Sequence, residues 1–150
     1  MITLTYNTYS TVWMEPDDME WVYKRQHEFL TDNEYWCLCQ MYPSGYVPEV
    51  VKLDRDLLKI KYIAPPTHSF YMMDGLMEHR APILAALKEA GIRHGDLTEY
   101  AVLIGEKCHP YLIDFSESRL WDDPRPDKRP EGDGYWLAKA LEWSMKVKYA

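Results

Sequence analysis

The sequence predicts an α+β fold in which a small antiparallel sheet precedes a set of helices. Before Tyr62, short segments of alternating apolar and polar residues are separated by polar turns, which is typical of a meander of strands. From Ser69 to Ala90, apolar residues recur at spacings of three and four, the helical period. Alternation then returns around Gly105 and predicts an antiparallel hairpin. A chain of 150 residues fits one domain, or two small lobes that share a cleft.

Five segments are expected to pair into the sheet. Three predicted turns separate some of these segments: residues 7–9, Pro16-Asp17-Asp18 and Asp54-Arg55-Asp56. In the third segment, Val22 and Lys24 share one face because side chains alternate along a strand. The expected strands are Ile2–Tyr6, Thr11–Glu15, Glu20–Arg25, Glu49–Leu53 and Leu57–Tyr62.

A helix is expected between the third and fourth strands. Thr31-Asp32-Asn33-Glu34 matches a capping box, in which Thr31 caps the helix and Glu34 reaches back to the cap residue. This interpretation starts the helix at Asp32 and ends it near Met41. It also turns the Glu34 side chain toward its own helix end.

Two further helices are expected in the second part of the chain. The first covers about Ser69 to Ala90, with a split or kink near Arg80 because Pro82 interrupts it, and Gly91 suits its C-terminal cap. The second is Asp133–Lys148, for which Asp133 is a good N-cap.

The hairpin brings two carboxylates to one place. Its expected strands, Ala101–Ile104 and Tyr111–Ile113, flank a turn from Gly105 to Pro110. In an antiparallel pair the start of one strand lies beside the end of the other. Asp114 should therefore lie beside residue 101 and close to Asp96, an arrangement that suits a base and a metal ligand.

Composition excludes several classes of protein. The chain has 17 basic and 24 acidic residues and a net charge of −7, which argues against coating nucleic acid or binding a membrane surface. It has no basic segment followed by an apolar run at its start and no stretch of eighteen apolar residues. The three cysteines are more typical of a reduced intracellular protein than of a disulfide scaffold. We expect a soluble cytoplasmic protein.

The stretch His94-Gly95-Asp96-Leu97-Thr98-Glu99-Tyr100-Ala101, followed by Ile113-Asp114-Phe115-Ser116, carries a family resemblance. It resembles the catalytic core of protein-kinase-like phosphotransferases, and is most similar to the RIO-type atypical kinases and the aminoglycoside phosphotransferases. The resemblance is specific between Gly91 and Arg119, and weaker from Thr11 to Ile63. It departs from the family pattern at Ala101, where the family has asparagine.

The resemblance implies a two-lobed kinase-like fold, with a small five-stranded lobe in residues 1–63 and a reduced, mainly helical lobe in 64–150. It implies that ATP and Mg²⁺ are bound, with Asp96 as the base that orients the acceptor and Asp114 as the metal ligand. Lys24 would hold the α- and β-phosphates. Glu34 would pair with Lys24, in competition with its capping role, and Glu28 is a second candidate for that pairing.

Two more contacts to the nucleotide are implied by the resemblance. The first turn of the sheet lacks the usual glycines, so the hydroxyls of Ser10 and Thr11 are the candidates for contacting the phosphates. The prolines after Ala64 predict an extended linker, and the backbone of Tyr62, Ile63 and Ala64 would then contact the adenine edge. His94 is expected to be structural, and Asp133 to brace the catalytic loop.

Three functions follow from the resemblance and stay open at this point. The first is transfer of the γ-phosphate to a protein Ser/Thr or a small-molecule hydroxyl. The second is a pseudokinase that binds nucleotide or a protein partner without catalysis, because Ala101 has no oxygen to offer a metal. The third is a RIO-like ATPase.

Overall fold

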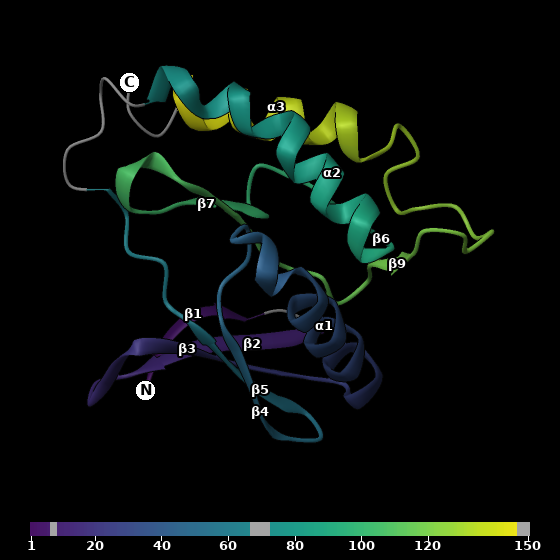
Figure 1. Cartoon of the computed structure of the whole chain (residues 1–150). Helices are drawn as coiled ribbons and strands as arrows, with labels where there is room; N and C mark the ends of the chain where they lie inside the picture. The colour runs from purple at the N-terminus through teal and green to yellow at the C-terminus, as the bar shows by residue number, and fades with distance from the viewer. Residues whose placement is uncertain (7–8, 67–72, 147–150) are drawn as a thin grey trace.

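The computed structural model describes residues 1–6, 9–66 and 73–146. A sheet and one helix form one part of the molecule, and a hairpin and two helices form the other (Figure 1). The predicted turn at residues 7–9 and the start of the predicted helix at residues 69–72 fall wholly or partly outside the described residues.

The expected five-stranded antiparallel sheet is confirmed. Its strands run in the order β1-β2-β3-β5-β4, and each pair of neighbours is antiparallel. Lys24 on β3 lies opposite Val12 on β2 and Leu58 on β5, so it occupies the centre of the sheet. The strands are β1 (Ile2–Tyr6), β2 (Ser10–Glu15), β3 (Asp18–Gln26), β4 (Val50–Asp54) and β5 (Leu57–Lys61).

Helix α1 (Glu28–Met41) packs on the sheet and begins one turn earlier than predicted. Its N-cap is His27, whose Nδ1 accepts a hydrogen bond from the backbone of Phe29. Thr31 donates its hydroxyl to the carbonyl of His27, four residues back, as Ser and Thr do inside helices. The predicted capping box at Thr31 and Glu34 is therefore wrong, and Glu34 is free to face away from the helix end.

The segment from Tyr62 to Pro66, after β5, is neither helix nor strand, and the predicted division between lobes falls within it. Within the described residues, the second helix consists of a 3₁₀ segment, η2 (Met73–His79), and α2 (Arg80–Ala90), with Pro82 in the first turn of α2. The expected break near Arg80 is thus present. Gly91 caps α2 with φ of 75°. Helix α3 covers Asp133–Lys146, and the two remaining residues of its prediction lie outside the described range.

The hairpin of β7 (Val102–Ile104) and β8 (Pro110–Leu112) is antiparallel, with Val102 opposite Leu112. Beyond it, the N–H of Ile113 donates to the carbonyl of Ala101, so Asp114 follows directly beside residue 101, as expected. A second pair, β6 (Ile92–Arg93) with β9 (Arg119–Leu120), was not expected. It joins the segment before His94 to the segment that follows Asp114.

The core lies between α1, the hairpin and the two later helices. Phe115 is fully buried within it, so the residue after Asp114 anchors that carboxylate to the core. None of the helices in the described part of the chain is both long and apolar enough to cross a membrane. Besides Phe115, the fully buried residues of this core include Leu38, Met41, Ile83, Leu87, Val102, Leu112, Leu137 and Leu141.

Candidate active site

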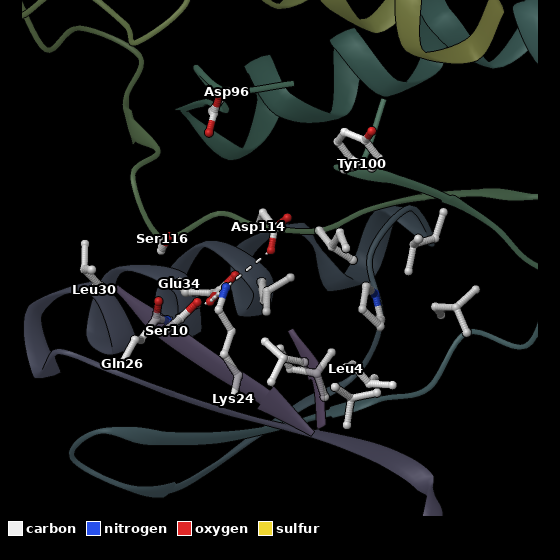
Figure 2. Close-up of a pocket in the computed structure, with 18 of the residues that line it drawn as sticks. Leu4, Ser10, Lys24, Gln26, Leu30, Glu34, Asp96, Tyr100, Asp114 and Ser116 are labelled. Atoms are coloured by element: carbon white, nitrogen blue, oxygen red, sulfur yellow. Dashed lines mark hydrogen bonds and ion pairs between the residues drawn. The ribbon is translucent and has the colours of Figure 1, made fainter. Parts of the chain in front are cut away.

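A cavity of about 1010 Å³ lies between the sheet and the hairpin. Lys24, Glu34, Asp96 and Asp114 all line it, although they come from β3, α1 and two separate loops. Figure 2 shows Lys24 extending from the sheet toward Glu34 and Asp114, with Asp96 on the far side and its carboxylate toward the cavity. The folded chain therefore brings the amine and the predicted carboxylates to one crevice.

Lys24 forms a buried ion-pair network. Its side chain is 7% exposed, and its Nζ lies 2.8 Å from Oε1 of Glu34 and 3.3 Å from Oδ1 of Asp114. Burial by itself lowers the pKa of Lys24, but the charges of Glu34 and Asp114 outweigh burial and raise that pKa above its usual value. The amine is therefore held charged and pointed into the cavity.

Glu34 connects three elements. Besides Lys24, its Oε1 accepts from Nε2 of Gln26 at 2.8 Å, and its Oε2 accepts from the N–H of Phe115 at 3.0 Å. The side chain is 1% exposed, so these bonds replace its hydration. Of the two candidates for the lysine partner, Glu34 makes the contact, whereas Glu28 is exposed in the first turn of α1.

Asp114 sits at the end of the hairpin in the left-handed region, with φ of 62°. A non-glycine residue in this region is uncommon and often marks a functional position. Its carboxylate is half exposed and faces the cavity, within 3.3 Å of Lys24. The backbone bends there because Phe115 on one side enters the core while Asp114 turns toward the opening.

The loop at residues 94–96 is held by His94 and Asp133. The His94 ring is buried, and its Nε2 lies 2.7 Å from the carbonyl of Ile113 while its Nδ1 accepts from the N–H of Asp96. The carboxylate of Asp133 accepts from the N–H groups of both His94 and Gly95, at 2.8 and 2.9 Å. His94 is thus structural and Asp133 braces the loop, as expected.

Asp96 makes two contacts that the sequence did not reveal. Its Oδ1 accepts from Nε of Arg129 at 2.9 Å, and its Oδ2 lies 3.6 Å from Nζ of Lys128. Both cations belong to the loop between β9 and α3, residues 121–132. The only signal in the sequence was the adjacent pair of basic residues in a loop that follows Asp114.

Comparison with known families agrees with this geometry. The family model of the RIO domain matches residues 13–129 of the chain. The chain belongs to the RIO-domain family. None of the curated proteins matches it. The match begins on β2 and ends at Arg129, so it includes Lys24, Glu34 and both predicted catalytic aspartates.

Position 101 of this RIO domain cannot hold a metal through its side chain. Ala101 is 1% exposed and packs in the core. Among the residues that the structure describes, no group of three or more His, Cys, Asp or Glu side chains is placed to hold a metal ion. The arrangement does fit Mg²⁺ held by the Asp114 carboxylate together with phosphate oxygens and water, because Mg²⁺ commonly uses only one or two protein carboxylates.

Only some of the other residues predicted to contact the nucleotide line the cavity. Ser10 lines the cavity, but Thr11 does not, because it pairs with Arg25 on the strand face opposite Lys24. Tyr62 and Ile63 line the cavity and Ala64 does not. The N–H of Tyr62 already donates to the carbonyl of Glu20 at 2.9 Å, so in this RIO domain it is engaged within the sheet.

Proposed function

We propose that this RIO domain is an ATP- and Mg²⁺-dependent phosphotransferase that transfers the γ-phosphate to a protein Ser/Thr or a small-molecule hydroxyl. The observation that carries the proposal is the convergence of Lys24, Asp96 and Asp114 on one cavity large enough for a nucleotide. Family membership supports a kinase-like protein, and the geometry of these three groups supports the reaction.

The apolar part of the cavity suits an adenine ring. Side chains from the sheet and from the hairpin line it, so a planar base would lie between two apolar surfaces. Ile63 follows β5 and lines the cavity, which supports a backbone contact to the base edge. The apolar lining includes Val12, Val22 and Ile60 from the sheet and Leu103, Ile104 and Ile113 from the hairpin segment.

Phosphoryl transfer depends on positioning and charge stabilisation more than on covalent chemistry. In the proposed reaction, Lys24 holds the α- and β-phosphates, and Glu34 keeps the amine directed at them. Asp114 would hold Mg²⁺, which would neutralise phosphate charge. Asp96 orients the acceptor hydroxyl and accepts its proton, a role that typically contributes about 10²–10⁴-fold to rate.

Ala101 favours a second candidate function. The missing amide leaves the protein with one fewer oxygen for a metal than the family pattern provides. A domain that binds nucleotide but transfers phosphate weakly or not at all is consistent with that change. Hydrolysis of ATP is the third outcome, since Asp96 can orient water in place of a hydroxyl.

Incubation with γ-labelled ATP and Mg²⁺ distinguishes these functions. Label on the protein or on an added acceptor supports phosphotransfer, free labelled phosphate supports an ATPase, and binding without either supports the pseudokinase. In the transferase, Asp96→Asn should lower the rate by at least about 100-fold, because the base is lost. Full activity of that variant would contradict the role of Asp96.

A further inference from the structure

Two consecutive cations of the loop between β9 and α3 lie against different oxygens of Asp96. Arg129 Nε is 2.9 Å from Oδ1, and Lys128 Nζ is 3.6 Å from Oδ2. Neither contact is within the catalytic loop itself, so a separate segment delivers both charges to the proposed base. The two side chains differ in how firmly they are held.

Arg129 is fixed in place. Its backbone N–H donates to the carbonyl of Gly95 at 3.1 Å, and its guanidinium stands 4.7 Å from the centroid of the Trp136 ring. The backbone, the ring and Asp96 thus hold it from three directions. Arg129 is a positioning residue: it occupies one oxygen of Asp96 and leaves the other directed toward Lys128.

Lys128 is held loosely and lines the cavity. Its side chain is 61% exposed, and its ammonium lies between Oε2 of Glu117 at 3.2 Å and Oδ2 of Asp96 at 3.6 Å. Ion pairs this exposed contribute little to stability. A lysine ammonium on a flexible four-carbon stem can therefore exchange one anionic partner for another at small cost.

The position of Lys128 coincides with the place where phosphate must be transferred. An acceptor hydroxyl bound to Oδ2 of Asp96 would lie about 2.7 Å from that oxygen. The phosphorus it attacks would be roughly 3–3.5 Å further on. The ammonium of Lys128, already beside Oδ2, is then within reach of the oxygens on the same phosphoryl group.

The distribution of charge in the cavity also supports a contact between Lys128 and phosphate. The ammonium of Lys24 is paired with Glu34 and Asp114, and Arg129 is paired with Asp96. Ala101 supplies no oxygen for a further metal, so more of the phosphate charge falls to protein cations. The hydrogen bond to Glu117 and the charge of Asp96 raise the pKa of Lys128, so it is protonated at neutral pH.

We propose that Lys128 binds the terminal phosphate of the nucleotide and exchanges Glu117 for it when a triphosphate enters. This inference rests on the proposed function, and it adds a specificity-determining residue that lies outside both sequence motifs. With the α- and β-phosphates held by Lys24, only the γ-phosphate would extend to the Asp96 side of the cavity, so Lys128 would select nucleoside triphosphate over diphosphate.

Calorimetric titration of the full chain with Mg²⁺ and either AMPPNP, a non-hydrolysable ATP analogue, or ADP tests the proposal. Lys128→Met should weaken AMPPNP binding by about tenfold, as expected for one charge-assisted hydrogen bond, and leave ADP binding within about twofold. Lys139→Met is the matched control: Lys139 is an exposed lysine on α3 outside the cavity, and its loss should change neither affinity.

A second variant tests the exchange of partners. Glu117→Gln removes the competing carboxylate, so AMPPNP should bind several-fold tighter in the otherwise unchanged chain. The same substitution in a Lys128→Met background should give no gain, since the freed lysine is absent. An equal gain in both backgrounds would show that only a repulsive charge had been removed, and would overturn the proposal.

The outcomes separate this inference from the proposed function. Suppose that the unchanged chain binds AMPPNP. If Lys128→Met then weakens the binding of AMPPNP and ADP equally, or weakens the binding of neither, the role proposed for Lys128 is wrong, although nucleotide binding is supported. If the unchanged chain binds neither AMPPNP nor ADP, the proposed function fails and the inference fails with it.

Discussion

Glu34 and Phe115, 81 positions apart, are joined by a hydrogen bond of 3.0 Å from the backbone N–H of Phe115 to Oε2 of Glu34. The other carboxylate oxygen holds Lys24 at 2.8 Å. A single buried side chain therefore fixes both the proposed phosphate-binding amine and the backbone beside the proposed metal ligand. The site is assembled by α1 as much as by the two motifs that carry its aspartates.

Removing Glu34 should destabilise the fold strongly. Glu34→Ala leaves the ammonium of Lys24 buried with one partner in place of two, and breaking a buried ion pair costs about 3 kcal/mol or more. Urea unfolding should report this loss in the free energy of unfolding. Glu28→Ala, at an exposed position of the same helix, should change that free energy by no more than about 0.5 kcal/mol. Equal effects of the two substitutions would contradict the role given to Glu34.

Asp133 should stabilise the loop at residues 94–96 more than its own helix, α3. Asp133→Ala removes the acceptor of two backbone N–H groups, those of His94 and Gly95. Stability should fall by about 1–3 kcal/mol, and hydrogen exchange should speed up around residues 94–96. Asp122→Ala is the control, because Asp122 is exposed and has no such contacts. Unchanged exchange at 94–96 in the Asp133 variant would show that the brace is dispensable.

Gly105 lies where the hairpin approaches the segment after β5. A Cβ added at Gly105 would come within 2.8 Å of the Tyr111 ring and 3.1 Å of Cγ2 of Ile63. Gly105→Ala should therefore displace the side chains of Tyr111 and Ile63, of which Ile63 lines the cavity. It should lower stability by about 1–3 kcal/mol and weaken nucleotide binding. At Gly75 the nearest atom would be 3.9 Å away, so Gly75→Ala is the matched control. Thermal unfolding and nucleotide titration of the two variants should differ clearly; matching behaviour would contradict the close approach.

Cys37 should be chemically inert in the folded protein. Burial, together with the charge of Glu34, raises the pKa of Cys37 to about 12. The folded thiol keeps its proton where the unfolded thiol loses it, so its contribution to stability is full below the unfolded pKa of about 8.5 and is lost as pH rises through about 12. With iodoacetamide at pH 8.5, the exposed Cys39 should be alkylated and Cys37 should not, whereas in urea both should react. Rapid alkylation of Cys37 without denaturant would contradict its burial.

Ala101→Asn tests whether the missing amide limits the metal site. The added oxygen should lower the Mg²⁺ concentration needed for nucleotide binding, because Mg²⁺ gains a protein ligand beside Asp114. Ala101 is buried, so the larger side chain should also cost about 1–3 kcal/mol of stability. Circular dichroism should first show that the variant is folded. Nucleotide binding measured at increasing Mg²⁺ concentration then checks the predicted change in the magnesium requirement. An unchanged magnesium requirement would indicate that position 101 does not face the metal.

The sequence predicted the sheet and the hairpin well because both depend on local patterns. Alternation with period two and turns at Pro16 or Gly105 are readable without knowing the tertiary structure. The start of α1 was missed because His27, an unusual cap, replaced the expected Thr31, whose hydroxyl instead bonds back inside the helix. The pair β6 and β9 was missed because two-residue strands carry no periodicity.

The sequence predicted those residues of the candidate site that the family resemblance includes. Lys24, Glu34, Asp96 and Asp114 all line one cavity, as the family resemblance implied, and the RIO-domain match covers all four. The contacts of Lys128 and Arg129 with Asp96 could not be predicted, since they depend on how a loop about thirty residues away in sequence crosses the catalytic loop. Ser10 and Thr11 were both predicted to contact the phosphates, but they are neighbours on β2 and their side chains point to opposite faces. Only Ser10 lines the cavity.

The most direct test of the central claim is calorimetric titration of the chain with AMPPNP, with and without Mg²⁺, beside the variant Asp114→Asn. Asp114 is half exposed, so the variant should fold. We predict saturable binding that Mg²⁺ tightens in the unchanged chain, and binding that Mg²⁺ no longer tightens in the variant. Absence of saturable binding in the unchanged chain, or the same response to Mg²⁺ in both proteins, would contradict a nucleotide site built on Lys24 and Asp114.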